Sequence, residues 1–191
     1  MRNIAVVDDD AAERRVLKGL LEESGFKVVA EGASGVEAIE ICRTKPPDLI
    51  IMDVKMPGKD GIEAAFEIDR LSPVPVILLT AHDDDETIRR AIEAGVMGYL
   101  LKPVKLEDIK PAVELAVSRF REFRLLSKEV TELKSALAAR KAVEKAKGLL
   151  MEKEGLTEQE AFARLRKISM DRRKSMGEIA EIVILALEDK K

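Results

Sequence analysis

The sequence is poor in the residues on which several common kinds of site depend. Its 191 residues include no tryptophan, one tyrosine, one cysteine (Cys42) and one histidine (His82). A lone cysteine excludes an internal disulfide framework, and a single Cys with a single His excludes a Cys/His zinc site. We therefore expect a protein of a reducing compartment, the cytoplasm.

Long apolar runs are also missing. The longest apolar run near the C-terminus is Ile182–Leu187, and the first run, Ile4–Val7, leads directly into acidic residues. A membrane-spanning helix needs about 20 apolar residues, and a secretory signal needs a basic start, an apolar core and a cleavage site. The sequence therefore predicts neither a membrane span nor a signal peptide.

Charge is abundant but unevenly distributed along the chain. Residues 1–124 carry 18 Lys and Arg against 24 Asp and Glu, a balance of −6, whereas residues 125–191 carry 15 against 12, a balance of +3. An acidic front and a basic back indicate two parts with different tasks.

The front part alternates apolar runs with amphipathic stretches. Runs that are apolar on consecutive residues are typical of parallel strands covered on both faces, and the amphipathic stretches predict crossover helices. Five such units indicate an α/β fold with a doubly wound, five-stranded parallel sheet. The predicted strands are Ile4–Val7, Lys27–Ala30, Leu49–Met52, Val76–Leu79 and Met97–Leu101, and the predicted helices cover 12–23, 35–44, 61–71, 84–94 and 107 onward.

The helix that begins near residue 107 is predicted to run far beyond the α/β part, because no Gly or Pro interrupts it between Pro111 and Gly148. Its apolar residues recur at spacings of three and four, which is the a/d pattern of about two heptads. The same stripe could form a coiled coil with a second copy or pack within an intramolecular helix hairpin. These residues are Phe123, Leu126, Val130, Leu133 and Leu137.

Two shorter helices are predicted at the end of the chain. Thr157 is followed by Glu160, and Ser175 by Glu178, so each pair forms a capping box that opens a helix, over about 158–170 and 176–188. With the end of the long helix, they predict an all-α tail of three helices.

Polar side chains follow four of the five predicted strands. Asp8, Asp9 and Asp10 follow the first strand, Asp53 the third, Thr80 the fourth and Lys102 the fifth. Because the carboxyl ends of parallel strands meet at one edge of the sheet, we expect these side chains to lie close together. Clustered carboxylates favour a hard cation such as Mg²⁺, and Asp53 could then act as the nucleophile toward a phosphoryl group, with Lys102 and Thr80 contacting its oxygens.

These residues carry a resemblance to a known family. Val7-Asp8-Asp9-Asp10, the segment Asp53–Gly61, Leu79-Thr80-Ala81 and Tyr99–Pro103 resemble the motifs of the receiver domain of two-component response regulators. The resemblance covers residues 3–122 and implies a flavodoxin-like fold. It implies that Asp53 accepts the phosphoryl group, and that Asp8, Asp9 and Asp53 hold Mg²⁺ with the Lys55 carbonyl. It further implies a switch and phosphoryl-binding set of Thr80, Ala81, Tyr99, Lys102 and Pro103, with a cis Lys102–Pro103 bond.

A different reading of the acidic residues is a phosphatase or phosphotransferase similar to haloacid dehalogenases. Such an enzyme would use Asp8 as nucleophile and Asp10 as acid. Ala12 stands where that motif usually has Thr or Val, and no substrate-capping insertion is present. We therefore expect a regulator, not an enzyme, whose only chemistry is self-phosphorylation from a donor and slow autodephosphorylation.

The tail holds two clusters of basic residues. Residues 164–174 contain six Lys and Arg and one acid, and a second cluster precedes and follows Gly148. Phe162 is the tail's only aromatic residue, and we expect it in the core, which argues against a stacking platform for single strands. Gly148 costs about 1 kcal/mol relative to Ala in a helix, which indicates close approach by another helix or by RNA, or packing against the terminal helices.

The tail carries a second resemblance. The segments Arg140–Met151, Ala161-Phe162 with Leu165-Arg166, Ser169–Met176 and Ile179-Ala180 resemble the ANTAR domain, which binds RNA and prevents transcription termination. The resemblance implies binding to stem-loops in leader transcripts, where loop bases splayed from a stem can be read. The residues that we expect to contact RNA are Arg140, Lys147, Gly148, Arg166, Arg172, Arg173 and Lys174.

The sequence therefore predicts a receiver at 1–122, a helical linker or short coiled coil at 123–139 and an ANTAR domain at 130–191. Its partners would be a sensor histidine kinase, hairpin RNA and, on phosphorylation, a second copy of the chain. The nearest alternative is a response regulator with a DNA-binding tail. That reading needs a recognition helix with polar side chains, and residues 176–187 offer mostly Ile, Val, Ala and Glu.

Overall fold

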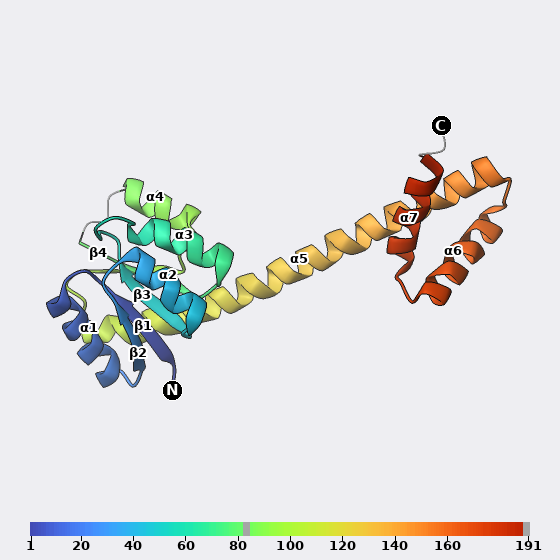
Figure 1. Ribbon diagram of the computed structural model, residues 1–191. Coiled ribbons are helices and arrows are strands. Elements are labelled where there is room, and N and C mark those ends of the chain that lie inside the picture. The colour runs from blue at the N-terminus through green and yellow to red at the C-terminus, as the bar shows by residue number, and fades with distance from the viewer. Residues whose placement is uncertain (82–84, 189–191) are drawn as a thin grey trace. The chain divides into compact units, whose positions relative to one another are not determined.

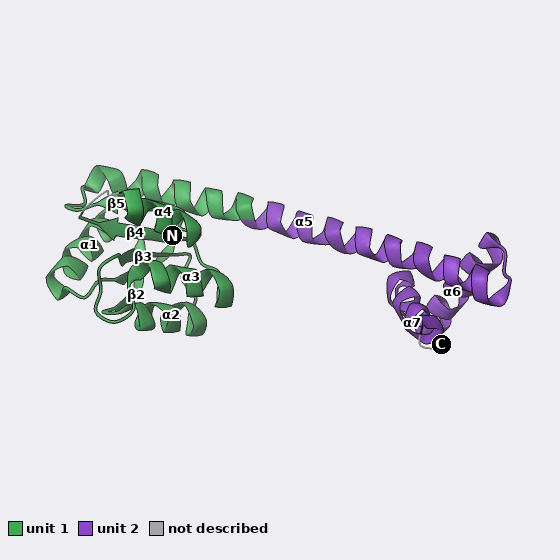
Figure 2. Cartoon of the chain, turned by 90° about the horizontal axis from the view of Figure 1, so that it is seen from above, with its two compact units in different colours: residues 1–123 green, residues 124–191 purple. Residues whose placement is uncertain are grey.

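The protein is described by a computed structural model that covers residues 1–81 and 85–188. His82 and the residue at which we expected the fourth helix to begin lie outside the described residues. The chain divides into two compact units, Met1–Phe123 and Arg124–Lys191 (Figure 2). No helix in the described part of the chain is long and apolar enough to cross a membrane.

The first unit is a parallel sheet of five strands in the order β2-β1-β3-β4-β5 (Figure 1). The strands and helices follow one another as predicted, with ends that move by one or two residues, so the α/β prediction is confirmed. The strands are β1 Asn3–Val7, β2 Lys27–Gly32, β3 Leu49–Asp53, β4 Val76–Thr80 and β5 Gly98–Leu101. The helices between and after them are α1 Ala11–Glu23, α2 Gly35–Thr44, α3 Gly61–Leu71, α4 Asp85–Glu93 and α5 Leu106–Glu154.

Both faces of the sheet are buried, which explains why its strands are apolar on consecutive residues. Alternate residues of β3 point to opposite faces: Ile50 and Met52 contact the layer formed by α2, α3 and α4, whereas Leu49 and Ile51 contact α1 and the start of α5. Cys42 lies in the first of these layers, where burial raises the pKa of its thiol to about 12. That cysteine is a small residue of the hydrophobic core.

The second unit is a small helical core. The last part of α5 packs with α6 Glu158–Arg172 and α7 Met176–Glu188. Both expected capping boxes are present, because Thr157 and Ser175 each accept from the backbone N–H three residues on while Glu160 and Glu178 accept from the capping residues. The buried residues are Ala146, Leu150, Ala161, Leu165, Ile179 and Ala180.

The apolar stripe on α5 takes no part in this core. Its members Leu126, Val130, Leu133 and Leu137 are 48–63% exposed, and Phe123 is 52% exposed. The helices α6 and α7 instead cover a later part of α5, from Ala142 to Leu150. The intramolecular hairpin that could have buried the stripe is therefore not formed by the described residues.

Candidate functional site

Among the described residues of the first unit, the two most deeply buried carboxylates lie at neighbouring strand ends. Asp8 follows β1 directly and Asp53 is the last residue of β3, and these strands pair in the sheet. Asp8 is only 2% exposed and Asp53 only 6%. Two buried charges of like sign are unfavourable unless a cation joins them.

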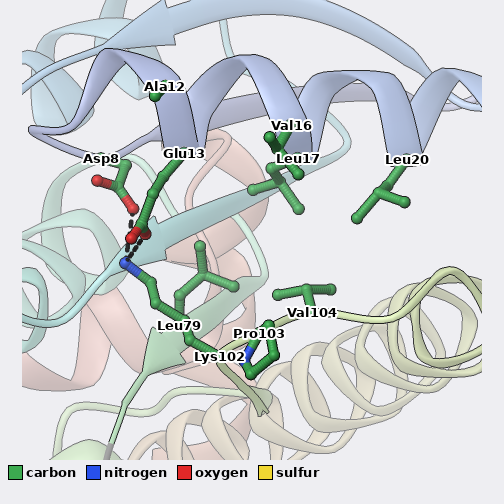
Figure 3. Close-up of a pocket in the computed structure, with 10 residues that line it drawn as sticks. All are labelled: Asp8, Ala12, Glu13, Val16, Leu17, Leu20, Leu79, Lys102, Pro103 and Val104. Atoms are coloured by element: carbon green, nitrogen blue, oxygen red, sulfur yellow. Dashed lines mark hydrogen bonds and ion pairs between the residues drawn. The ribbon is translucent and has the colours of Figure 1, made fainter.

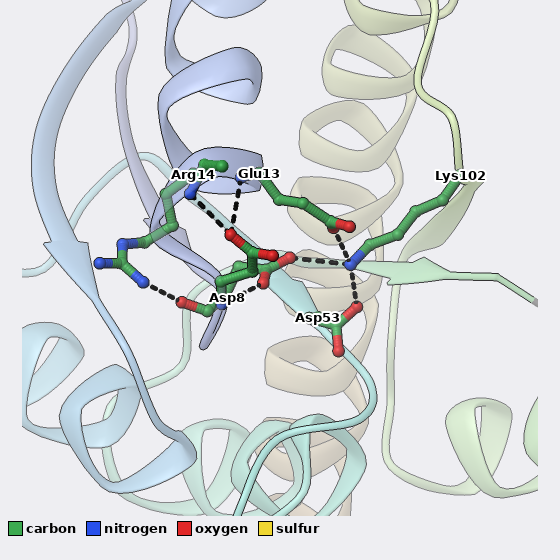
Figure 4. Close-up of polar contacts among 7 residues, drawn as sticks. Asp8, Glu13, Arg14, Asp53 and Lys102 are labelled. Atoms are coloured by element: carbon green, nitrogen blue, oxygen red, sulfur yellow. Dashed lines mark hydrogen bonds and ion pairs between the residues drawn. The ribbon is translucent and has the colours of Figure 1, made fainter.

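Lys102, which follows β5, supplies that cation (Figure 4). Its Nζ lies 2.8 Å from Asp8 Oδ2 and 2.6 Å from Asp53 Oδ1. The same ammonium also pairs with the Glu13 carboxylate at the start of α1. The convergence that the strand-end rule predicted is thus observed for Asp8, Asp53 and Lys102, residues up to 94 positions apart in the sequence.

The ionisation of these groups reflects burial set against charge pairing. Burial raises the pKa of Asp53, and its contacts with Lys102 and the backbone N–H of Lys55 offset part of that rise. Burial alone would lower the pKa of Lys102, but hydrogen bonds to Asp53, Asp8 and Glu13 outweigh it, and the pKa is raised. Lys102 is therefore a permanent positive charge beside Asp53 at neutral pH.

The loops around Asp8 and Asp53 are held by specific contacts. Asp10 caps α1 by accepting from the backbone N–H of Ala12 and Glu13. The Arg14 guanidinium donates to the carbonyl oxygen of Asp8. After Asp53, the backbone N–H of Gly61 donates to the carbonyl oxygen of Val54. A Cβ at Gly61 would lie 2.1 Å from the carbonyl oxygen of Asp53, so only glycine fits at this position.

The donor set at this edge suits a small hard cation. Asp8 and Asp53 already share one positive group, and carboxylate and carbonyl oxygens are the ligands that Mg²⁺ prefers. Asp9 and Lys55 are exposed and line one surface depression beside Val54. Among the described residues, no three His, Cys, Asp or Glu side chains form a cluster that could hold a metal ion.

The remaining residues of the predicted switch set border the same edge. Thr80 ends β4 and Ala81 follows it in an exposed bend. Tyr99 on β5 is 52% exposed, and with Thr80 and Val54 it lines a cavity beside α4. The Lys102–Pro103 peptide bond is cis.

Glu13 is a residue of this site that the sequence analysis missed. It lies in the first turn of α1, close to the capping Asp10, and an acid at that position could have been recognised as facing the same edge as Asp8. With Asp8 and Lys102, Glu13 also lines the polar end of a cavity whose other end is apolar, lined by Val16, Leu20 and Val104 (Figure 3).

Within residues 140–174 of the second unit, the basic residues other than Lys147 fall into two groups. Lys145 pairs with Glu188, Arg164 pairs with Glu154, and Lys153 donates to the Leu187 carbonyl. A second group is exposed and forms no ion pair with any described residue. These free cations are Arg140, Lys141, Arg166, Lys167, Arg172, Arg173 and Lys174.

Three expectations for the tail need correction. Lys147 is only 8% exposed, and its ammonium bridges Glu144 and Glu158, so it ties α5 to α6 and is withdrawn from the RNA-contacting set. Gly148 is exposed and a Cβ there would meet nothing within 4 Å, so packing against the terminal helices does not explain this glycine. Phe162 is 44% exposed and lies outside the core in which we expected it.

Comparison with known families accounts for both units. Residues 4–114 match the response regulator receiver domain, and residues 131–184 match the ANTAR domain. The first match covers more than half of the chain. The protein therefore belongs to the response regulators, with a receiver domain followed by an ANTAR domain, and the haloacid dehalogenase reading is dropped.

Individual relatives support the same assignment. The transcriptional regulatory protein PdtaR of Mycobacterium tuberculosis is 46% identical over 186 residues, which cover 97% of this chain and 91% of the relative. The chemotaxis protein CheY of Halobacterium salinarum is 37% identical over 118 residues, which cover 61% of this chain and 94% of the relative.

Solved structures resemble the first unit. The signal receiver domain of the response regulator NarL from Mycobacterium tuberculosis is 31% identical with a TM-score of 0.58, covering 61% of this chain and 96% of that one. The receiver domain of the sensor histidine kinase PA1611 from Pseudomonas aeruginosa is 28% identical with a TM-score of 0.56, covering 61% of this chain and 98% of that one. The latter structure has a magnesium ion coordinated in its active site cleft.

Proposed function

We propose that the protein is an antiterminator controlled by phosphorylation. A sensor histidine kinase phosphorylates Asp53, and the phosphorylated protein binds stem-loops in leader transcripts through its ANTAR domain. The observation that carries the proposal is the buried Asp53 carboxylate held beside the Lys102 ammonium, on the same chain as seven cations within residues 140–174 that form no ion pair with any described residue.

The phosphoryl step follows from that geometry. An Asp53 oxygen attacks the phosphorus of a phosphohistidine on the kinase, the phosphorus–nitrogen bond breaks, and the imidazole leaves with the bonding electrons. The product is an aspartyl phosphate on Asp53. Lys102 lies within hydrogen-bond distance of Asp53 and can neutralise charge on the transferred oxygens.

Mg²⁺ would be held by Asp8, Asp9, Asp53 and the Lys55 carbonyl, and when bound it offsets the negative charge of carboxylates and phosphoryl group together. Asp8 and Asp53 share the Lys102 ammonium, so the protein already tolerates a cation between them. The Thr80 hydroxyl and the Ala81 backbone N–H would contact the new phosphoryl oxygens. Tyr99 would pack toward Thr80 once that contact forms, since both line one cavity.

A second copy of the chain is the proposed partner of the α5 stripe. Four apolar residues in a/d spacing are about half exposed or more, and no described helix covers them. A coiled coil of two such helices would bury the stripe on both chains. Phosphorylation of Asp53 would favour this dimer.

The RNA-binding face is proposed to comprise the unpaired cations and Gly148. Arg140, Arg166, Arg172, Arg173 and Lys174 are free to meet phosphates. At Gly148 the absent side chain leaves room for an RNA backbone. Arg173 adopts φ 51°, a left-handed conformation that usually selects Gly, so an arginine there carries a local backbone cost.

Removing three of these cations should weaken RNA binding and flatten its salt dependence. The variant combines Arg172→Ala, Arg173→Gly and Lys174→Ala, in which glycine suits the left-handed backbone. Each lost phosphate contact reduces the slope of log affinity against log salt by roughly 0.7–0.9, so three contacts remove about 2 to 3. Titration of a stem-loop RNA at several salt concentrations measures the slope.

The matched control removes the same charge from cations that are already engaged within the tail. It combines Lys145→Ala, Lys153→Ala and Arg164→Ala, three residues with intrachain partners. The control should keep nearly the parent slope. Equal slopes for both triple variants would show that only net charge matters, and an unchanged affinity in the first variant would remove residues 172–174 from the RNA-binding face.

A further inference from the structure

Phe162 is an exposed aromatic ring on a helix whose other face fills the tail core. Its neighbour Ala161 and the residue one turn on, Leu165, are fully buried, yet Phe162 is 44% exposed. It is the only aromatic residue in the second unit. Because Phe162 is only partly buried, its ring contributes less to the stability of the folded tail than a fully buried phenylalanine would.

The charge beside Phe162 on α6 that is left unpaired is positive, because Glu158, four residues before the ring, is bound by Lys147. Residues four positions apart on a helix lie on the same face, so Arg166 stands one turn from the ring and Met170 one turn further. Arg166 and the adjacent Lys167 are exposed and form no ion pair with any described residue. The ring therefore lies beside positive charge that the protein itself does not neutralise.

The exposed apolar side chains of α7 lack this setting. Ile182 and Leu185 on α7 are 42% and 63% exposed, but that helix carries Glu178, Glu181 and Glu188 and no basic residue. A protein surface covering Phe162 would have to desolvate Arg166 and Lys167 or supply acids for them. A polyanion with flat apolar faces satisfies the cations and the ring together, and an RNA loop is such a ligand.

We propose that Phe162 is a base-stacking residue, whose ring receives the face of one unpaired RNA base while Arg166 contacts the adjoining phosphate. This inference rests on the proposed RNA binding and adds how the tail distinguishes loop from stem. Bases in a paired stem are stacked on one another and expose only their edges, whereas a base splayed from a loop offers its π face. The contact thus selects unpaired nucleotides without reading their identity.

The test uses the full-length protein and a pool of stem-loop RNAs with a short randomised loop, compared with the same stem closed into an uninterrupted duplex. Phe162→Leu keeps an apolar side chain but removes the aromatic face, and it should weaken loop binding by about 10- to 100-fold, the effect of one stacked base. Phe162→Trp should retain the parent affinity. Because the chain has no other tryptophan, the emission of this variant should be quenched by the stem-loop pool and not by the duplex.

Leu185→Trp is the matched control, since Leu185 is more exposed than Phe162 but lies on the acidic helix. Its emission should not be quenched by RNA.

The inference is overturned if Phe162→Leu binds the stem-loop pool as the parent does, or if the emission of Phe162→Trp is not quenched by that pool. It is also overturned if Phe162→Leu dissociates the protein without changing RNA affinity, because the ring would then contact a second copy. If the parent itself does not prefer stem-loops to duplex, the proposed function fails first, and that result is visible before any variant is compared.

Discussion

Replacing Asp53 by Asn is expected to abolish Mg²⁺-dependent phosphorylation completely. Asn is nearly isosteric with Asp but lacks the carboxylate oxygen that attacks phosphorus. Asp8 is the other described carboxylate that is buried beside Lys102, and it accepts from the Asp10 backbone N–H, so it is needed to hold its own loop. Incubation with a small radiolabelled phosphodonor measures incorporation. The fold should be unaffected, because Asp8 and Glu13 continue to pair with Lys102.

Asp171→Asn is the control, because it makes the same chemical change at an exposed carboxylate of the tail. It should be labelled like the parent. Persistent labelling of the Asp53 variant would refute Asp53 as the acceptor, and a phosphoryl group found on Asp8 would place the acceptor there instead.

The second large effect concerns assembly. Val130→Glu with Leu133→Glu places two charges in the exposed stripe of α5, where the proposed coiled coil would bury both side chains. Each Val or Leu side chain that becomes buried contributes about 1.5–3 kcal/mol to the free energy of association. A change of about 1.4 kcal/mol in that free energy changes the affinity tenfold. The double variant should therefore stay monomeric at concentrations where the phosphorylated parent dimerises, as measured by light scattering or sedimentation.

Thr131→Glu with Ser135→Glu adds the same charge at exposed positions off the stripe. These substitutions should leave dimerisation intact. A fully phosphorylated parent that remains monomeric would contradict the proposed partner of the stripe, and so would equal dimerisation of the two double variants.

Much of the receiver site was predictable because parallel strands end at one edge. Asp8, Asp53 and Lys102 are separated by dozens of residues, yet each follows or ends a strand, and the topology alone brings them together. Glu13 was missed because strand ends do not identify helix residues. Its position becomes informative only when the first turn of α1 is known to face the acidic edge.

The tail was harder because helical periodicity defines faces but not their partners. Lys147 was grouped with the basic residues by charge, and nothing local reveals that Glu158 of the next helix would meet it. Phe162 was assigned to the core because an isolated aromatic next to Ala161 and Leu165 usually lies there. A three-helix core has room for only part of each apolar stripe, and which residue stays outside depends on how the helices cross.

The most direct test of the account is the affinity for the stem-loop RNA pool before and after phosphorylation, with the Asp53→Asn variant as reference. Coupling between two sites typically changes affinity by about 5- to 150-fold. The account predicts that phosphorylation strengthens stem-loop binding by at least tenfold in the parent, leaves the Asp53 variant unchanged, and does not raise affinity for duplex DNA. Equal affinities of the phosphorylated and unphosphorylated parent, or no preference for stem-loops over duplex DNA, would contradict it.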